Sequence, residues 1–299
     1  MRSAAQWIAI IVLLAVIAIA IWFFVFDRPG SRGPSPAVLN PHPAPASTAP
    51  QYPINRASVP ASGASPALPD LHNSDASVMQ ALLAIPGAQG LRDLLLQQAI
   101  IPNIVATVDA LPRQTFGSTR IMPLRTPGGT FAIEQDKGRT LIAAQNYRRY
   151  APYMQVLKSV DDKALVAWYV HDYPLFQQAY RELGYPKGYF NDRLIATIDN
   201  LLATPEPKQP IEVKKSGAFY VYADPQLESL SAGQKMLLHT GPENEAQIKI
   251  KLQDLRALLV GQKLPAPGKS LAPAGQVGTA PASTVTPATR ARPAAAGTR

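Results

Sequence analysis

Two adjacent residues, His171 and Asp172, are the first candidates for acid–base chemistry in this sequence. A carboxylate beside an imidazole can orient the ring and stabilise its protonated form, as a general base requires. A base also needs a nucleophile or a substrate proton, and the sequence has no GxSxG, HExxH or glycine-rich phosphate-loop motif. We therefore favour a structural assignment, in which Asp172 caps a helix and His171 is a surface or hinge residue.

Several carboxylates stand near predicted helix starts, where unpaired N–H groups and the helix dipole favour acids. They are Asp224, Glu228, Glu243 and Glu245. Two carboxylates brought close by the fold could instead hydrolyse a glycosidic bond, and the sequence leaves this alternative open. His239 precedes a Gly-Pro break and is predicted to be a cation at a helix C-terminus.

The composition predicts no metal, no cofactor and no identifiable catalytic residue. The chain has no cysteine and only four histidines. Thiolate nucleophiles and cysteine-ligated zinc or iron–sulfur sites are therefore excluded.

The most unusual side chains are aromatic rings grouped around the Pro186–Gly188 turn, with arginines on both sides. They are Tyr180, Tyr185, Tyr189 and Phe190, flanked by Arg181 and Arg193. Such a group is typical of partner-binding hot spots, but also of rings packed beneath a helix–helix turn. We favour core packing for the group as a whole and predict it for Phe190. The partner-binding candidates are Tyr185, Tyr189 and Arg193.

Hydrophobic spacing predicts a mainly α fold, a compact multi-helix domain with two small β-hairpins over residues 70–262. Helices are expected from Asn73 or Ser74, from Pro102 to Pro112, from Asn146 to Val160, from Asp161, from Asn191 or Asp192 to Pro205, from Asp224, and from Gly241. The helix from Asp161 either kinks at Pro174 or gives way to one capped by Asp172, and Gly184 ends it. The hairpins are expected around Asp136-Lys137-Gly138 and Lys215-Ser216-Gly217.

A transmembrane helix is predicted over residues 7–26, after a short N-terminal segment, residues 1–6. The stretch has no charged residue and carries aromatic residues at both ends. As a helix it would be about 30 Å long, which matches the hydrocarbon core of a bilayer. Asp27-Arg28-Pro29 follows in place of a small-residue cleavage site, so we expect an uncleaved anchor. The short N-terminus favours a cytoplasmic start and a translocated domain.

Two low-complexity segments flank the predicted domain. Residues 27–69 contain 11 of the chain's 30 prolines and are expected to form an extended linker. Residues 263–299 are expected to form a disordered basic tail rich in proline and alanine. Between Asp70 and Val260 there are 20 Lys and Arg against 19 Asp and Glu, so the net charge of +9 belongs mostly to the ends. We therefore expect no nucleic-acid binding by the folded domain.

Four segments resemble a bacterial family known as domain of unknown function 3014. They are IVATVDALPR (Ile104–Arg113), YRRYAPY (Tyr147–Tyr153), Tyr173–Pro205 and Tyr222–Asn244. The resemblance spans roughly Asp70 to Leu259 and implies an N-terminally anchored envelope protein of a Gram-negative bacterium. It implies no activity and no functional residue.

Together these features predict a single-pass protein of the bacterial inner membrane whose folded domain is periplasmic. Its function is expected to be that of a tethered interaction or scaffolding domain, and its partner an envelope protein or the cell wall. The alternative is a tethered periplasmic hydrolase that acts on a glycan with paired carboxylates.

Overall fold

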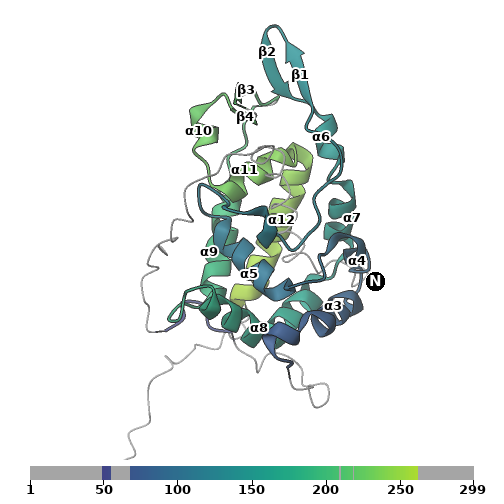
Figure 1. The fold of residues 1–299 in the computed structure, drawn as a ribbon, viewed down its shortest axis with the longest axis vertical. Coiled ribbons are helices and arrows are strands. Elements are labelled where there is room, and N and C mark those ends of the chain that lie inside the picture. The colour runs from purple at the N-terminus through teal and green to yellow at the C-terminus, as the bar shows by residue number, and fades with distance from the viewer. Residues whose placement is uncertain (1–48, 55–67, 209, 218, 262–299) are drawn as a thin grey trace, which may run out of the picture. The chain divides into compact units, whose positions relative to one another are not determined.

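The computed structural model describes residues 49–54, 68–208, 210–217 and 219–261 (Figure 1). The predicted membrane helix, most of the linker and the basic tail lie outside these residues. None of the helices in the described ranges is both long enough and apolar enough to span a bilayer.

The described domain is mainly helical and has two small antiparallel sheets, as predicted. The helices before the first hairpin are η3 (Leu71–Asn73), α3 (Asp75–Ala84), α4 (Leu91–Leu94), α5 (Ile100–Ala110) and η4 (Thr119–Ile121). Between the hairpins lie α6 (Gln145–Arg148), α7 (Ala151–Ser159), α8 (Asp162–Glu182) and α9 (Phe190–Leu202). After them come α10 (Pro225–Glu228), α11 (Ala232–His239) and α12 (Pro242–Gly261).

The central core is formed where α5, α8, α9 and α12 pack against one another. Each contributes the apolar face that its sequence spacing predicts, for example Leu194, Ile198 and Leu201 of α9. Buried ion pairs add to these contacts: Lys251 of α12 lies 2.9 Å from the Asp162 carboxylate at the start of α8. Burial raises the pKa of Asp162 to about 7, and the hydrogen bond from Lys251 opposes this shift.

The first hairpin pairs β1 (Ile133–Asp136) with β2 (Arg139–Ile142), and Lys137 and Gly138 form its turn with positive φ angles. The second pairs β3 (Val213–Ser216) with β4 (Phe219–Tyr222). Ser216 pairs with Phe219, so Lys215 and Ser216 of the predicted turn belong to β3, and of the three predicted residues only Gly217 lies between the strands. The hairpins lie side by side, because Leu141 bridges to Glu212 (Figure 1).

The prediction that Asp172 caps a helix is wrong, because α8 runs through Pro174 without interruption. A proline inside a helix removes one backbone hydrogen bond, which packing can offset. Aromatic contacts do so here across the proline: the Phe176 ring lies 5.5 Å from Trp168 and 5.1 Å from Tyr169.

Two other helix predictions also need correction. The helix predicted over 146–160 is divided into α6 and α7, and Pro152 lies in the first turn of α7, where a missing N–H costs no bond. The start of helix α11 was not predicted, although Ser231 and Gln234 form a capping box there. That pattern is a recognised start signal in sequence.

Candidate functional site at the α8–α9 turn

The turn between α8 and α9 carries the predicted partner-binding residues, and its main chain is held at several points. Helix α8 ends in a glycine C-cap motif, as predicted: the Gly184 N–H donates to Arg181 O (3.1 Å) and the Tyr185 N–H to Tyr180 O (3.3 Å). The amide of Gln177 then donates to Gly188 O (2.8 Å) and accepts from the Phe190 N–H (3.0 Å). One side chain of α8 therefore fixes both the turn and the start of α9.

The aromatic rings at this turn divide into buried and partly exposed members. Phe190 is only 1% exposed and stacks on Phe176 with ring centroids 5.5 Å apart, so its predicted core packing is confirmed. Tyr180 is buried and stacks on Tyr185 at 4.5 Å. Tyr185 and Tyr189 are half-buried. In the described chain, the hydroxyl of Tyr189 receives no hydrogen bond.

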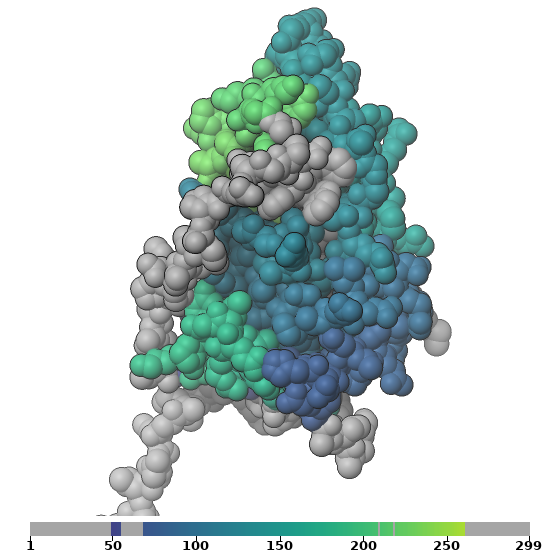
Figure 2. Space-filling model, in the orientation of Figure 1, coloured from purple at the N-terminus to yellow at the C-terminus, as the bar shows by residue number. Residues whose placement is uncertain are grey.

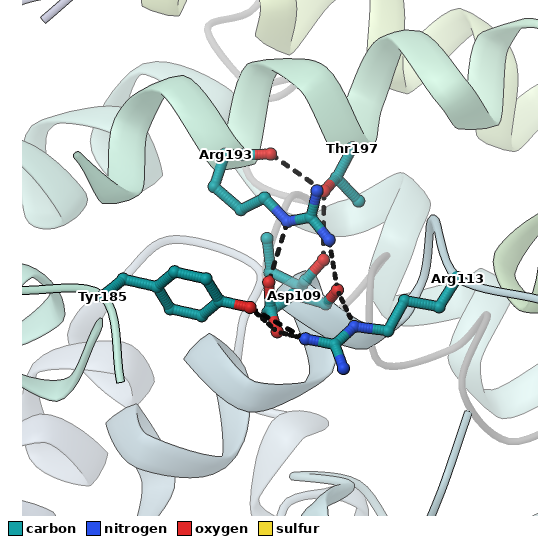
Figure 3. A network of polar contacts seen from close by, with 6 residues as sticks. Asp109, Arg113, Tyr185, Arg193 and Thr197 are labelled. Carbon is teal, nitrogen blue, oxygen red and sulfur yellow. Dashed lines mark hydrogen bonds and ion pairs between the residues drawn. The ribbon is translucent and has the colours of Figure 1, made fainter. Parts of the chain in front are cut away.

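A buried carboxylate, Asp109 of α5, connects the turn to α9 (Figure 3). Its Oδ1 lies 3.0 Å from Arg193 Nε, and its Oδ2 pairs with Arg113 of the following turn. The Tyr185 hydroxyl donates to Asp109 Oδ2 (3.1 Å) and accepts from Arg113 (2.9 Å). The structure therefore brings Tyr185 and Arg193 together on one acid, while Tyr189 makes none of these contacts.

The backbone of α5 takes part in the same network. Arg193 also donates to Asp109 O, and the Thr197 hydroxyl donates to Val108 O (3.0 Å) and Arg193 O (2.8 Å) (Figure 3). Burial raises the pKa of Tyr185, and the charge of Asp109 adds to this shift. With two arginines on one carboxylate, the group keeps one excess positive charge. The Arg113 and Arg193 side chains remain 35% and 26% exposed.

Sequence reasoning missed Asp109 and Arg113 as members of this site. They lie 76 and 72 residues before Tyr185, so no local pattern links them to the turn. The one available signal was their own spacing, because a chain that turns as a helix does brings an acid and an arginine four residues apart close together.

The first acid–base candidates do touch each other. His171 Nδ1 lies 3.2 Å from Asp172 Oδ2, and both belong to α8. His171 is partly exposed, in keeping with the surface position predicted for it. Burial raises the pKa of Asp172, and the hydrogen bond to His171 opposes this shift.

Most of the carboxylates considered for glycan hydrolysis serve structural contacts. Asp224 caps α10 by accepting from the Gln226 N–H (2.8 Å). Glu228 accepts from the Tyr222 N–H (2.9 Å) and pairs with Lys235 (3.1 Å). Glu245 lies in the first turn of α12, as does Glu243, and pairs with Lys249 at 2.8 Å. Within the described ranges, no group of three or more residues could hold a metal ion.

His239 is the last residue of α11, as expected for a helix C-terminus, but it is not the predicted cation. The side chain is buried, and its ring lies 5.5 Å from Tyr222 and 6.0 Å from Phe131 of the hairpin region. Burial lowers the pKa of His239 to about 4, and the charges of Lys235 and Arg149 add to this effect. The imidazole is therefore neutral at pH 7.

This burial predicts acid sensitivity. The folded-state pKa lies below the unfolded value of 6.5, so the unfolded chain binds the extra proton first. The neutral His239 side chain therefore makes its full contribution to the free energy of unfolding above pH 6.5. Roughly 3 kcal/mol of this contribution is lost as the pH falls towards 4. Urea unfolding at pH 7 and pH 4 should show this loss in the wild type and not in His239→Gln. The control His72→Gln, at an exposed histidine, should behave as the wild type; equal losses in all three proteins would refute the assignment.

The fold and this site define a compact α-helical domain with paired β-hairpins, cross-linked by a buried aspartate between two arginines. The chain belongs to the family described as "Protein of unknown function (DUF3014)", whose model matches residues 100–256. The match covers α5 to α9, both hairpins and most of α12, and thus every residue of the Asp109 network. No curated protein and no solved structure shows a significant match.

Proposed function

We propose that this protein is a membrane-anchored interaction domain of the bacterial envelope. Residues 7–26 would form the inner-membrane anchor, and residues 27–69 the tether of a periplasmic domain that binds an envelope protein or the cell wall. Support for the anchor comes from the length and apolarity of that stretch and from its flanking residues. The nearly balanced charge of the domain speaks against nucleic acid as its ligand.

One observation carries the binding role: Asp109 holds the α8–α9 turn in a fixed arrangement. Its contacts with Tyr185, Arg113 and Arg193 order side chains that would otherwise lose rotamer freedom on binding a partner. Beside them, Tyr189 is half-buried. Arginine and tyrosine held in this way on a surface are the side chains that interfaces favour.

The space-filling view shows where this surface lies. The α8–α9 turn, in green, stands beside the purple start of the domain around η3 (Figure 2). His72 of η3 lies 3.7 Å from Glu182, the last residue of α8, so the two segments are neighbours. The proposed docking surface consists of Tyr189 together with Tyr185 and Arg193.

The glycan-hydrolase alternative has less support, since Asp224, Glu228 and Glu245 are engaged in structural contacts.

The test is photo-crosslinking in cells. A benzoylphenylalanine at position 189 should give an adduct of defined mass in the membrane fraction. The same residue at position 250 should not, although Ile250 is 59% exposed on α12. Tyr185→Phe removes the hydroxyl between Asp109 and Arg113 but keeps the ring, so it should weaken the adduct from position 189.

A further inference from the structure

A short piece of the predicted linker contacts the domain at the start of α9. Its two main-chain donors point at one carboxylate: the Gln51 N–H donates to Asp192 Oδ2 (2.9 Å) and the Tyr52 N–H to Asp192 Oδ1 (2.7 Å). The neighbouring side chain completes the contact, because Asn191 Nδ2 donates to Tyr52 O (2.7 Å). Three main-chain groups of two consecutive residues are therefore bound by two adjacent side chains.

The Asn191 amide is oriented before it meets the segment. The Tyr169 hydroxyl, buried in α8, donates to Asn191 Oδ1 at 3.1 Å. With its oxygen so engaged, the amide can present only its NH₂ group to the outside, and that group needs an acceptor such as a peptide carbonyl. Asn191 is itself buried, so leaving this group unpaired would carry a desolvation penalty.

Only alternate side chains of the segment pack against the domain. Tyr52 and Ile54 are half-buried against the main core, while Gln51 and Pro53 are exposed. The Tyr52 hydroxyl reaches Arg256 of α12, whose pKa is raised first by its hydrogen bond with Asp199 and also by Tyr52. The site thus recognises a bent main chain that presents two consecutive N–H groups to one carboxylate, and beside them one aromatic ring.

We propose that Asn191 and Asp192 form a binding clamp for a bent peptide segment, and that residues 51–54 occupy it as an intramolecular competitor. A partner peptide with two consecutive non-proline residues and a tyrosine at the second position would bind by displacing this segment. The proposal deepens the interaction role proposed above, since the clamp adjoins Tyr189 in sequence and names the kind of partner that fits there.

Tethering makes the cis segment a strong competitor. A ligand linked to its own site through a short chain is present at an effective concentration in the millimolar range. A free peptide must compete with that concentration, and its apparent affinity falls by the fraction of clamps left open. Vacating the clamp should therefore increase trans binding by about tenfold or more.

The probe is a fluorescein-labelled, C-terminally amidated peptide with the sequence of residues 49–54, titrated against the full chain in detergent micelles. Gln51→Pro/Tyr52→Pro removes both N–H donors from the cis segment and should bind the peptide about tenfold tighter than the wild type. The matched control Gln51→Ala/Tyr52→Phe keeps both donors and should stay within about threefold of the wild type. Adding Asp192→Asn to the proline variant should abolish the gain, whereas Asp93→Asn, at an exposed acid of α4, should not.

The proposal is overturned if the proline variant binds the peptide no better than the wild type, or if Asp192→Asn leaves its binding unchanged. Amide hydrogen exchange gives a second readout that does not depend on the peptide. The Gln51 and Tyr52 amides should exchange at least about tenfold faster in Asp192→Asn than in the wild type, and equal rates would also refute the clamp. An unchanged crosslink from position 189 alongside a failed titration would refute the clamp alone, and would leave the interaction role standing.

Discussion

Phe190→Ala is expected to lower the free energy of unfolding by about 3–5 kcal/mol. The ring is buried between Phe176, Tyr180 and Tyr169, with centroids 5.5, 5.7 and 6.4 Å away, so truncation leaves a cavity lined by aromatic side chains that cannot easily close. For a domain of this size, such a loss corresponds to a melting temperature roughly 6–20 °C lower. Thermal and urea unfolding, followed by circular dichroism, would measure it.

The matched controls are Leu183→Ala and Tyr189→Ala. Leu183 lies at the same turn but is 42% exposed, and Tyr189 is half-buried, so the two changes differ from Phe190→Ala in burial. Leu183→Ala should change stability by only about 0.5 kcal/mol or less. A melting temperature of Phe190→Ala that matches Leu183→Ala would contradict the packing of the turn described above.

Asp109→Asn is expected to cost about 3 kcal/mol. The change keeps the shape of the side chain but removes the charge that Arg113 and Arg193 share. Removing one partner of a buried ion pair typically costs about 3–5 kcal/mol, and the partial exposure of the two guanidinium groups places this case at the lower end. Chemical unfolding of the wild type and the variant at one pH would measure the difference.

Asp199→Asn is the control for this prediction, since Asp199 also forms an ion pair from α9, with Arg256. The Asp199 side chain is 45% exposed, against 5% for Asp109, and ion pairs with an exposed carboxylate contribute only about 0–1 kcal/mol. The double variant Asp109→Asn/Arg193→Met should lose less unfolding free energy than the two single variants lose in sum, because the two residues form an ion pair with each other. Equal losses for Asp109→Asn and Asp199→Asn would show that Asp109 does not hold the turn.

Local patterns predicted much of the fold. The spacing of Leu194, Ile198 and Leu201 gave the buried face of α9 because a helix places such positions on one side. Gly184 and Gly138 marked turns because glycine accepts the positive φ angles that other residues resist. These features depend on residues within a few positions of one another, and so they are legible in one sequence.

The predictions that failed concern residues whose environment is set by contacts with other segments. His239 was assigned as a cation by the rule for helix C-termini, but Phe131 and Tyr222 of the hairpin region pack against it. Asp172 was assigned as a cap because Pro174 follows, but packing across the proline keeps α8 whole.

The candidate site shows the same division. Tyr185 and Arg193 were found from composition, yet their common partner Asp109 lies on a helix more than 70 residues earlier. The binding of Gln51 and Tyr52 by Asp192 spans about twice that separation, at 141 and 140 residues. No periodicity within one element predicts either contact, and only the folded chain shows them.

Crosslinking from position 189 in intact cells tests most directly whether the α8–α9 turn is a docking surface. A docking turn should give a single adduct of defined mass from position 189, none from position 250, and a weaker one from position 189 in Tyr185→Phe. Equal adducts from both positions, or none from 189 in a chain that is folded and present in the membrane, would contradict it. So would release of soluble fragments from purified cell wall by the protein, if Glu228→Gln abolished that release, since this would favour the hydrolase.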